Sequence, residues 1–552
     1  MRKLFLLLIL ILLPSLVGAT DGVSTIPTIY FSDLTSAPAT GGKNNQGAFI
    51  SLYGKNFGAT RETSTITVNG TEASNYEVWL DTYAAFQMGS GTTTGNIILT
   101  TSAGASNTLP FTVRAGNIYF VDASTPTAGD GSYGNHWQSP VSYFNAMAAG
   151  DTCYFRAGTY SEKYHAGSSK YQISLTRAIA GTENNEIAWI GYPGEIARFE
   201  ATAEGTIEGN IDFYTTTRDY YTFANLQLYG YYRACVYLTG QYNRIIGNDC
   251  ESLKVHSYAI INPVTGCNYA YIYGNKLHGA TSGNKLDHPL YIGYGADNVD
   301  FGWNYIYGND VGYGPLISIN QDYASRDNVV FENIRIHDNI IDCNSLARAI
   351  GMLAANTGSS FYIYNNIIYN GVTESVNQYK VLYQISGSAY VYNNVIYNPL
   401  GDFYTIGVST FTSTTENYIP EIAYYKNNII YGSTDVDYLL VEHEDVMGTV
   451  SFDYNCWYGS GTALSRDTHG VFTDPGFTSP GSENFVLLST STCRDVGLST
   501  TEITDVAPKD FVGVSRPQED VIDIGTYEYY TGATGSITNK LIYQGIFYGG
   551  SF

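Results

Sequence analysis

The chain has 552 residues, and 27 Lys and Arg against 50 Asp and Glu give it a formal charge of −23 at pH 7. Hydrophobic residues make up 44% of it, which is enough for a packed core and excludes global disorder. So acidic a chain is a poor nucleic-acid binder, because phosphate contacts need dense Lys and Arg. With 51 Tyr, 58 Gly and only 14% charged residues, the composition favours a β-rich protein.

The first residues predict a secretory signal. Arg2 and Lys3 precede an apolar run that ends near Val17, and the small residue Ala19 would allow cleavage directly after it. We therefore expect residues 1–19 to be removed and the mature protein to be secreted or held at the cell surface. No later stretch is long and apolar enough to predict a membrane span.

Seven cysteines are scattered along the chain without the Cys-x-x-Cys spacing of a zinc site. Their odd number leaves at least one thiol free or paired between chains. We expect most of them to be small buried core residues, with one or two disulfides left open as an alternative.

Residues 24–114 predict a small β-sandwich. Short β-type runs alternate with turns, and Asn69-Gly70 between two extended runs is a strong hairpin signal. The segment resembles the IPT/TIG family of immunoglobulin-like domains in Leu52-Tyr-Gly-Lys-Asn-Phe-Gly58 and in the hairpin Thr67-Val-Asn-Gly70. That resemblance implies a spacer or binding module without an active site.

From about residue 117 the chain repeats a short motif, seen most clearly in Tyr362-Ile-Tyr-Asn-Asn366-Ile-Ile-Tyr. Its Asn recurs at intervals of 23 to 35 residues, at Asn225, Asn248, Asn275, Asn304, Asn339, Asn366, Asn394, Asn428 and Asn455. A constant motif with variable insertions predicts stacked turns of a solenoid, with loops emerging between fixed strands. Asn tolerates a left-handed backbone and can bond its own kind on the next rung, at a spacing of about 4.8 Å.

These features predict an all-β protein in which a right-handed parallel β-helix occupies residues 117–530. A propeller is disfavoured because the units are short and lack blade signatures, and a leucine-rich horseshoe because there is too little Leu and no helix in each repeat. The segment Gly150-Asp-Thr-Cys-Tyr154 through Gly158-Thr-Tyr160 resembles the opening coil of secreted β-helix proteins of the pectate-lyase-like superfamily. Asp474-Pro-Gly-Phe477 and Asp523-Ile-Gly-Thr-Tyr527 resemble the closing segment of such proteins.

The resemblance implies a fold and leaves the chemistry open, because this superfamily includes lyases, hydrolases, epimerases and non-enzymatic adhesins. Beyond the closing segment, the aromatic C-terminal tail 531–552 would dock onto another chain, giving self-association, or onto its own last coil.

Candidate catalytic residues come from aligning the strand that follows each loop. One column then contains Arg233, Tyr258, His288, Gly314, Arg348 and Lys380. Cleavage of an acidic polysaccharide by β-elimination needs a cation to neutralise the uronate carboxylate and a base to remove the C5 proton. We assign Arg348 as the carboxylate clamp and either His288 or Lys380 as the base. The lyases of the superfamily use Lys or Arg as base, often with Ca²⁺, and the column resembles them in residue type.

Other side chains complete this hypothesis. The predicted substrate-binding residues are Arg233, Tyr258, Lys285, Asp287, Tyr291 and Asp322. Hard oxygen ligands for Ca²⁺ could come from Asp297, Asp300 and Glu332.

Two alternatives remain open. Paired carboxylates, either Asp287 with Asp322 or Glu442 with Glu444, could serve a glycoside hydrolase. Alternatively, the basic column consists of ordinary solvated side chains, and the protein is a non-catalytic adhesin or matrix component. The leading hypothesis is a secreted carbohydrate-active protein that binds an anionic polysaccharide and cleaves it as a lyase.

Overall fold

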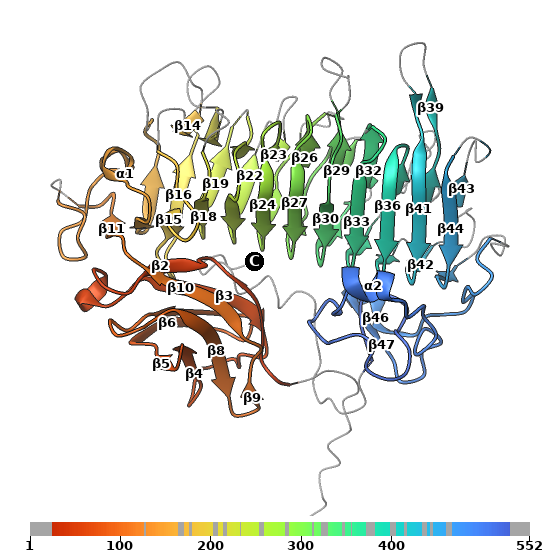
Figure 1. Cartoon of the computed structure of the whole chain (residues 1–552), viewed down its shortest axis with the longest axis horizontal. Coiled ribbons are helices and arrows are strands. Elements are labelled where there is room, and N and C mark those ends of the chain that lie inside the picture. The colour runs from red at the N-terminus through yellow and green to blue at the C-terminus, as the bar shows by residue number, and fades with distance from the viewer. Residues whose placement is uncertain are drawn as a thin grey trace, which may run out of the picture.

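The computed structural model has three parts: an N-terminal β-sandwich, a solenoid, and a closing segment that follows the last coil (Figure 1). It describes residues 25–125, 129–163, 171–175, 179–201, 208–213, 218–231, 233–252, 259–281, 286–311, 314–321, 329–344, 348–354, 356–370, 381–397, 405–412, 417–432, 439–441, 445, 447–459 and 466–529. Among these residues there is no helix of the length and apolar character that a membrane span requires. The predicted signal and the aromatic tail lie outside the described residues.

The sandwich is formed by two sheets of short strands. One sheet has the order β1 (Thr28–Ser32), β3 (Phe49–Lys55), β7 (Tyr83–Gln87) and β6 (Asn75–Trp79). The other has the order β2 (Ser36–Pro38), β10 (Leu109–Arg114), β8 (Gly95–Thr101), β4 (Thr65–Val68) and β5 (Thr71–Glu72), with β9 (Gly104–Ala105) paired to β8. The hairpin expected at Asn69-Gly70 joins β4 to β5, and both residues have positive φ.

The solenoid consists of three long parallel sheets. The first contains β11 (Ile118–Val121), β12 (Thr152–Phe155), β15 (Ile187–Gly191), β18 (Tyr221–Ala224), β21 (Arg244–Ile246), β24 (Asn268–Tyr273), β27 (Asp297–Gly302), β30 (Ile334–His337), β33 (Ser360–Tyr364), β36 (Gly387–Tyr392), β41 (Pro420–Lys426) and β44 (Thr449–Asp453). The second contains β13 (Gly158–Tyr160), β16 (Ala197–Glu200), β19 (Gln227–Gly230), β22 (Asp249–Ser252), β25 (Lys276–His278), β28 (Tyr305–Ile306), β31 (Ile340–Asp342), β34 (Ile367–Tyr369), β37 (Val395–Tyr397), β42 (Ile429–Tyr431) and β45 (Cys456–Tyr458).

The third sheet contains β14 (Tyr171–Ser174), β17 (Gly209–Asp212), β20 (Val236–Leu238), β23 (Ala259–Pro263), β26 (His288–Gly293), β29 (Pro315–Asn320), β32 (Arg348–Ala354), β35 (Leu382–Gln384), β38 (Ile406–Val408) and β43 (Leu439–Val441). Each strand pairs in parallel with the same strand of the next coil, so the chain climbs one rung per turn. Parallel crossovers are right-handed. The predicted right-handed parallel β-helix, preceded by a small Ig-like sandwich, is therefore confirmed.

The interior of the solenoid is a stack of apolar rows. In the first sheet, strand pairing aligns Ile272, Phe301, Ile336, Ile363 and Val391, and all five are fully buried. The alternation that the sequence shows within each strand sends every second side chain into this core. All seven cysteines are buried and free.

A ladder of asparagines runs from coil to coil along the turn between the first and second sheets, from Asn248 to Asn455. The side-chain Oδ1 of Asn366 accepts from the backbone N–H and Nδ2 of Asn339, and its own Nδ2 donates to Oδ1 of Asn394. The same pattern runs through Asn248, Asn275, Asn304, Asn339, Asn366, Asn394, Asn428 and Asn455. It ends on Asp467, whose Oδ2 accepts from Nδ2 of Asn455 at 2.9 Å. All eight amides are buried, so the ladder supplies polar partners inside the wall of the solenoid.

The left-handed backbone lies one residue before each ladder position, and not at the ladder Asn itself. Asn365, Asn393 and Asn427 have φ of 54°, 55° and 57°. Asn225, which the sequence places in the repeat, also occupies this preceding position, with φ of 57°. The ladder site of its coil is Leu226, whose N–H donates to Asn248. The placement of Asn225 in the ladder is therefore wrong, and its Nδ2 donates to Asp33 of the sandwich instead.

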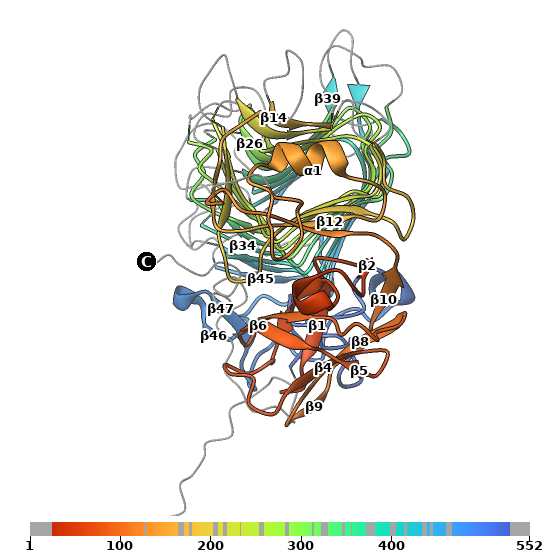
Figure 2. The ribbon, with the colours of Figure 1, turned by 90° about the vertical axis from the view of Figure 1, so that its left-hand side faces the viewer.

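The remaining elements cover apolar surface. Helix α1 (Pro140–Ala146) lies across the open end of the first coil, where Tyr143 packs on Trp189 (Figure 2). The closing segment carries β46 (Phe477–Ser479), β47 (Asn484–Leu487) and α2 (Thr501–Val506), while β39 (Phe411–Thr412) pairs with β40 (Asn417–Tyr418). Residues 466–471 extend the last coil, and the rest packs along the outside of the first and second sheets.

Asn366→Ala tests the ladder. It should lower the free energy of unfolding by about 3 kcal/mol, because buried donors and acceptors on Asn339, Ile336 and Asn394 would lose their partner. This change in the free energy of unfolding is measured by urea unfolding followed by circular dichroism. Asn145→Ala, at an exposed position of α1, is the control and should change stability by less than about 0.5 kcal/mol. Equal effects of the two substitutions would contradict a supporting role for the ladder.

Candidate functional site

The start of each strand of the third sheet brings two predicted site residues into one row. Ala259 pairs with His288, and Pro315 pairs with Arg348. Because Leu290 pairs with Ile317, two residues further along each strand, His288 lies level with Pro315. His288 and Arg348 therefore share a row, two rungs apart, with Pro315 between them.

Two other entries of the predicted column, Arg233 and Gly314, are displaced by one residue. Ala259 and Pro315 are the residues level with His288, so Pro315 takes the place assigned to Gly314. Val236 pairs with Ile261, which puts Ala234 and not Arg233 in register. Loop lengths differ from coil to coil, and sequence alignment alone could not fix where each strand begins.

His288 is 4% exposed and stacks on Tyr291, with ring centroids 5.6 Å apart. Its Nδ1 lies 2.6 Å from the carbonyl oxygen of Pro315. A carbonyl only accepts, so Nδ1 carries the proton and Nε2 carries a lone pair. Burial lowers the pKa of His288 to about 4, so the ring is neutral at ordinary pH. Such a ring can accept a proton, but it is a weak base.

Arg348 is half-buried, and its guanidinium lies over the ring of Tyr383, 5.4 Å from the centroid. The Tyr383 hydroxyl is 2.9 Å from Oγ of Ser409. Tyr383 and Tyr291 occupy one row of the sheet, with Ser318 and Gly351 between them. A cation held on an aromatic ring above a rigid sheet suits recognition of a carboxylate.

Two further predicted residues have structural partners. The Nε of Arg233 donates to Oε2 of Glu208 at 2.6 Å, and Glu208 is 1% exposed. Arg233 therefore neutralises a buried carboxylate, and the substrate contact predicted for it is not supported by its position. Asp287 is fully buried. The remaining predictions fall outside the described residues: Tyr258, Lys285, Asp322, Lys380, Glu442 and Glu444.

The three acidic residues predicted to bind Ca²⁺ do not converge. The backbone N–H of Glu332 donates to Oδ1 of Asp297 at 2.8 Å, so these two are neighbours. Asp300 instead contacts Nε2 of His337 at 2.7 Å. Over the described part of the chain, no three His, Cys, Asp or Glu side chains gather as a metal site. A requirement for Ca²⁺ stays a prediction.

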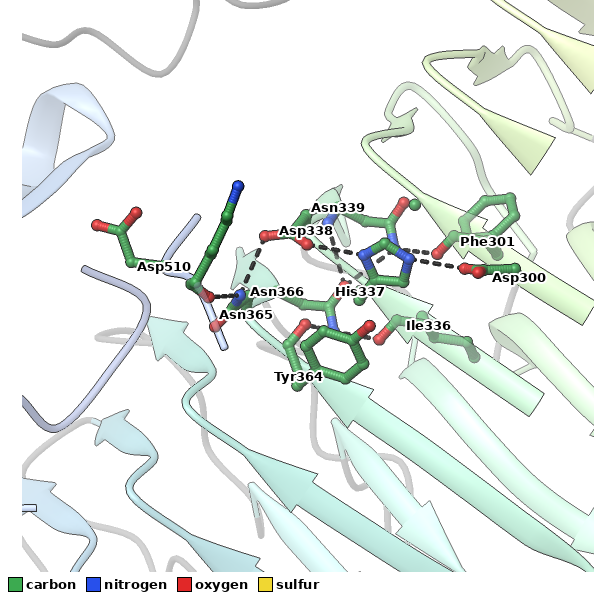
Figure 3. A network of polar contacts seen from close by, with 12 residues as sticks. Asp300, Phe301, Ile336, His337, Asp338, Asn339, Tyr364, Asn365, Asn366 and Asp510 are labelled. Carbon is green, nitrogen blue, oxygen red and sulfur yellow. Dashed lines mark hydrogen bonds and ion pairs between the residues drawn. The ribbon is translucent and has the colours of Figure 1, made fainter. Parts of the chain in front are cut away.

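His337 lies at the centre of a polar network that the sequence reasoning missed (Figure 3). Its Nε2 contacts Asp300 and its Nδ1 contacts Asp338, both at 2.7 Å. Burial alone would lower the pKa of His337, but the two carboxylates raise it to about 9. The ring is therefore a buried imidazolium between two anions.

This network holds the three parts of the protein together. His337 stacks on Tyr364 and meets the edge of Trp303, which in turn stacks on Tyr30 of the sandwich. Asn365 donates from Nδ2 to Asp338 and to the carbonyl of Lys509 in the closing segment. In the sequence this network is marked by a departure from the repeat, because His337-Asp338 stand where the next coil has Tyr364-Asn365. A seam between parts, and not a substrate site, explains these contacts.

No protein-family model and no curated protein sequence matches the chain. Among solved structures it is similar to the pectate lyase Pel9A, with 14% identity, a TM-score of 0.45 and coverage of 75% of this chain and 96% of that one. A Yersinia enterocolitica family 28 exopolygalacturonase matches at 10% identity and TM-score 0.37, over 81% and 96% of the two chains. A rhamnogalacturonan lyase matches at 13% identity and TM-score 0.32, over 72% and 99%.

His337→Gln tests the seam through its pH dependence. A His whose folded pKa is raised from 6.5 to about 9 stabilises the protein fully below pH 6.5, and this stability is lost as pH rises to 9. The loss should amount to about 3 kcal/mol in urea titrations of the wild type. The variant should be less stable at pH 6 and nearly flat over that range. His469→Gln, at an exposed histidine, is the control and should leave the wild-type slope intact.

Proposed function

We propose that this protein is a secreted carbohydrate-active enzyme that binds an acidic polysaccharide along the outer face of the third sheet and cleaves it by β-elimination. Arg348 carries the proposal, because its guanidinium is held over the ring of Tyr383 at the start of a strand in a rigid sheet. The proposal includes cleavage of the signal and IPT/TIG membership of the sandwich.

The packing of the other parts leaves this face available among the described residues. The sandwich packs on the first sheet, through Tyr154 and Ile190 among others. The closing segment packs on outward residues of the second sheet such as Ile367 and Ile429. Neither cluster includes a residue of the third sheet.

In the proposed reaction, Arg348 pairs with the uronate carboxylate and so stabilises the charge that develops when the C5 proton leaves. The base takes that proton, a double bond forms between C4 and C5, and the C4–O bond to the leaving sugar breaks. The clamp and the base must act on the same sugar. Two rungs separate Arg348 from His288, a distance of about 10 Å between their backbones.

One rung, about 5 Å, suits a shared sugar better. In the sequence Lys380 precedes Leu382 by two residues, as Arg348 precedes Ile350, and Leu382 pairs with Ile350. We therefore favour Lys380 as the base. His288 then acts as a positioning residue for the strand and for Tyr291.

Lyase activity is tested on pectate, alginate and glycosaminoglycans by the ultraviolet absorbance of unsaturated uronides, with Ca²⁺ or with a chelator. We expect Arg348→Ala to lower kcat/KM by about 100-fold or more, since it removes the group that neutralises the carboxylate. Arg198→Ala, which breaks an ion pair with Glu200 on the second sheet, is the matched control and should retain activity. Reducing ends released without that absorbance would indicate a hydrolase. Binding without cleavage would indicate a non-catalytic protein.

His288→Gln tests the neutral, buried histidine. Because its folded pKa is lowered from 6.5 to about 4, its contribution to stability is present above pH 6.5 and is lost as pH falls through 4. The wild type should lose about 3 kcal/mol of unfolding free energy over that interval, and the variant should not. If His288 only positions the strand, kcat should fall by less than about 10-fold while Lys380→Ala abolishes turnover. If Lys380→Ala leaves kcat unchanged, Lys380 is not the base.

A further inference from the structure

Two of the seven cysteines differ from the rest in where they lie. Cys153, Cys235, Cys250, Cys267 and Cys343 belong to the apolar interior of the solenoid. Cys456 and Cys493 belong instead to the cluster between the second sheet and the closing segment. Cys456 is on β45 in the last coil, and Cys493 follows β47 in the closing segment.

The backbone segments around these two residues lie side by side. The Sγ of Cys456 donates to the carbonyl of Thr473 at 3.5 Å. The Oγ1 of Thr473 donates to Oγ1 of Thr492, the residue before Cys493, at 3.0 Å. Thr492 in turn donates to the carbonyl of Asp474 at 2.9 Å. The two thiols therefore lie at one seam, close enough for Cys493 to raise the pKa of Cys456.

We propose that Cys456 and Cys493 form a disulfide that fastens the closing segment to the last coil of the solenoid. Its formation joins the two Sγ atoms and removes two protons and two electrons. The oxidant is another disulfide, either a small molecule or a thiol–disulfide oxidoreductase, which leaves as two thiols.

The bond must form while the protein folds. Both side chains are fully buried in the folded protein. The hydrogen bond to Cys493 and burial raise the pKa of Cys456 well above its ordinary value, and a thiol held protonated does not attack a disulfide. Once the seam has closed, burial of both sulfur atoms keeps reducing thiols away from the bond.

The position of Cys456 and Cys493 explains how a disulfide between them would stabilise the protein. Cys235 and Cys250 also share a thiol contact, but they lie on neighbouring coils that strand hydrogen bonds already join. Residues 466–471 pair with the last coil through the backbone, whereas the part that carries Cys493 packs on the solenoid through side chains such as Phe477 and Phe485 and through scattered hydrogen bonds. A covalent link at Cys456 therefore restrains a part that could otherwise separate from the sheet, by limiting the unfolded chain.

The full chain is produced in an oxidising and in a reducing compartment, denatured, alkylated and digested without reductant. The oxidised preparation should yield a peptide pair that joins Cys456 to Cys493 and that separates on reduction. Alkylation of both cysteines in the oxidised preparation would overturn the proposal.

Thermal unfolding supplies a second, independent test. The oxidised wild type should melt at least about 2 °C above the reduced one, and Cys493→Ala and Cys456→Ala should remove this difference. Cys343→Ala, at an equally buried cysteine of the interior, is the matched control and should keep it. A difference that persists in Cys493→Ala would overturn the proposal even if the variant is less stable overall.

Discussion

The stacking of the later coils of the solenoid depends on the asparagine ladder. Each side-chain amide accepts from the previous coil and donates to the next, so eight amide dipoles point the same way through the wall. The donor end meets the carboxylate of Asp467, which also accepts from the indole of Trp457. An anion at the positive end of aligned dipoles is the same pairing that stabilises an anion at a helix N-terminus. The ladder fixes the register between coils, and register decides which side chains share a row.

The polarity of the outward side chains decides which parts of the sheets are covered by the sandwich or the closing segment. Outward residues of the second sheet are polar in the early coils, as at Arg198 and Asp249, and apolar in later ones, as at Ile367 and Ile429. The apolar side chains of the closing segment pack on the later, apolar part of this sheet. The sandwich likewise covers an apolar stretch of the first sheet that includes Phe120 and Ile190. Both flanking parts therefore act as covers for the solenoid, since water-exposed apolar rows of this size are costly.

The sequence predicted the fold because the ladder and the inward rows are local and repeat. The Asn of the ladder recurs in eight successive coils and an apolar side chain recurs in the row of Ile363, so period and spacing alone reveal them. The candidate site was harder to place, because the third strand starts at a variable distance from the ladder. His288 follows Asn275 by thirteen residues, whereas Arg348 follows Asn339 by nine. The pairing of Arg233 with Glu208 and of His337 with Asp300 are contacts between separate coils, which no local pattern encodes.

The pKa values of two buried histidines in the solenoid are shifted in opposite directions, and the difference lies in their hydrogen-bond partners. His288 donates to a single neutral carbonyl, so burial prevails and the neutral ring is favoured. His337 has a carboxylate on each nitrogen, and two charges outweigh the same burial. In the folded protein His288 is therefore neutral above about pH 4 and His337 is charged below about pH 9, and the stabilising contributions of both are complete only near pH 6.5. A lysine base and a uronate substrate are both charged over most of the range between these pKa values. In the proposed reaction the base must therefore have its pKa lowered, and a cation such as Arg348 lowers the pKa of a lysine close to it.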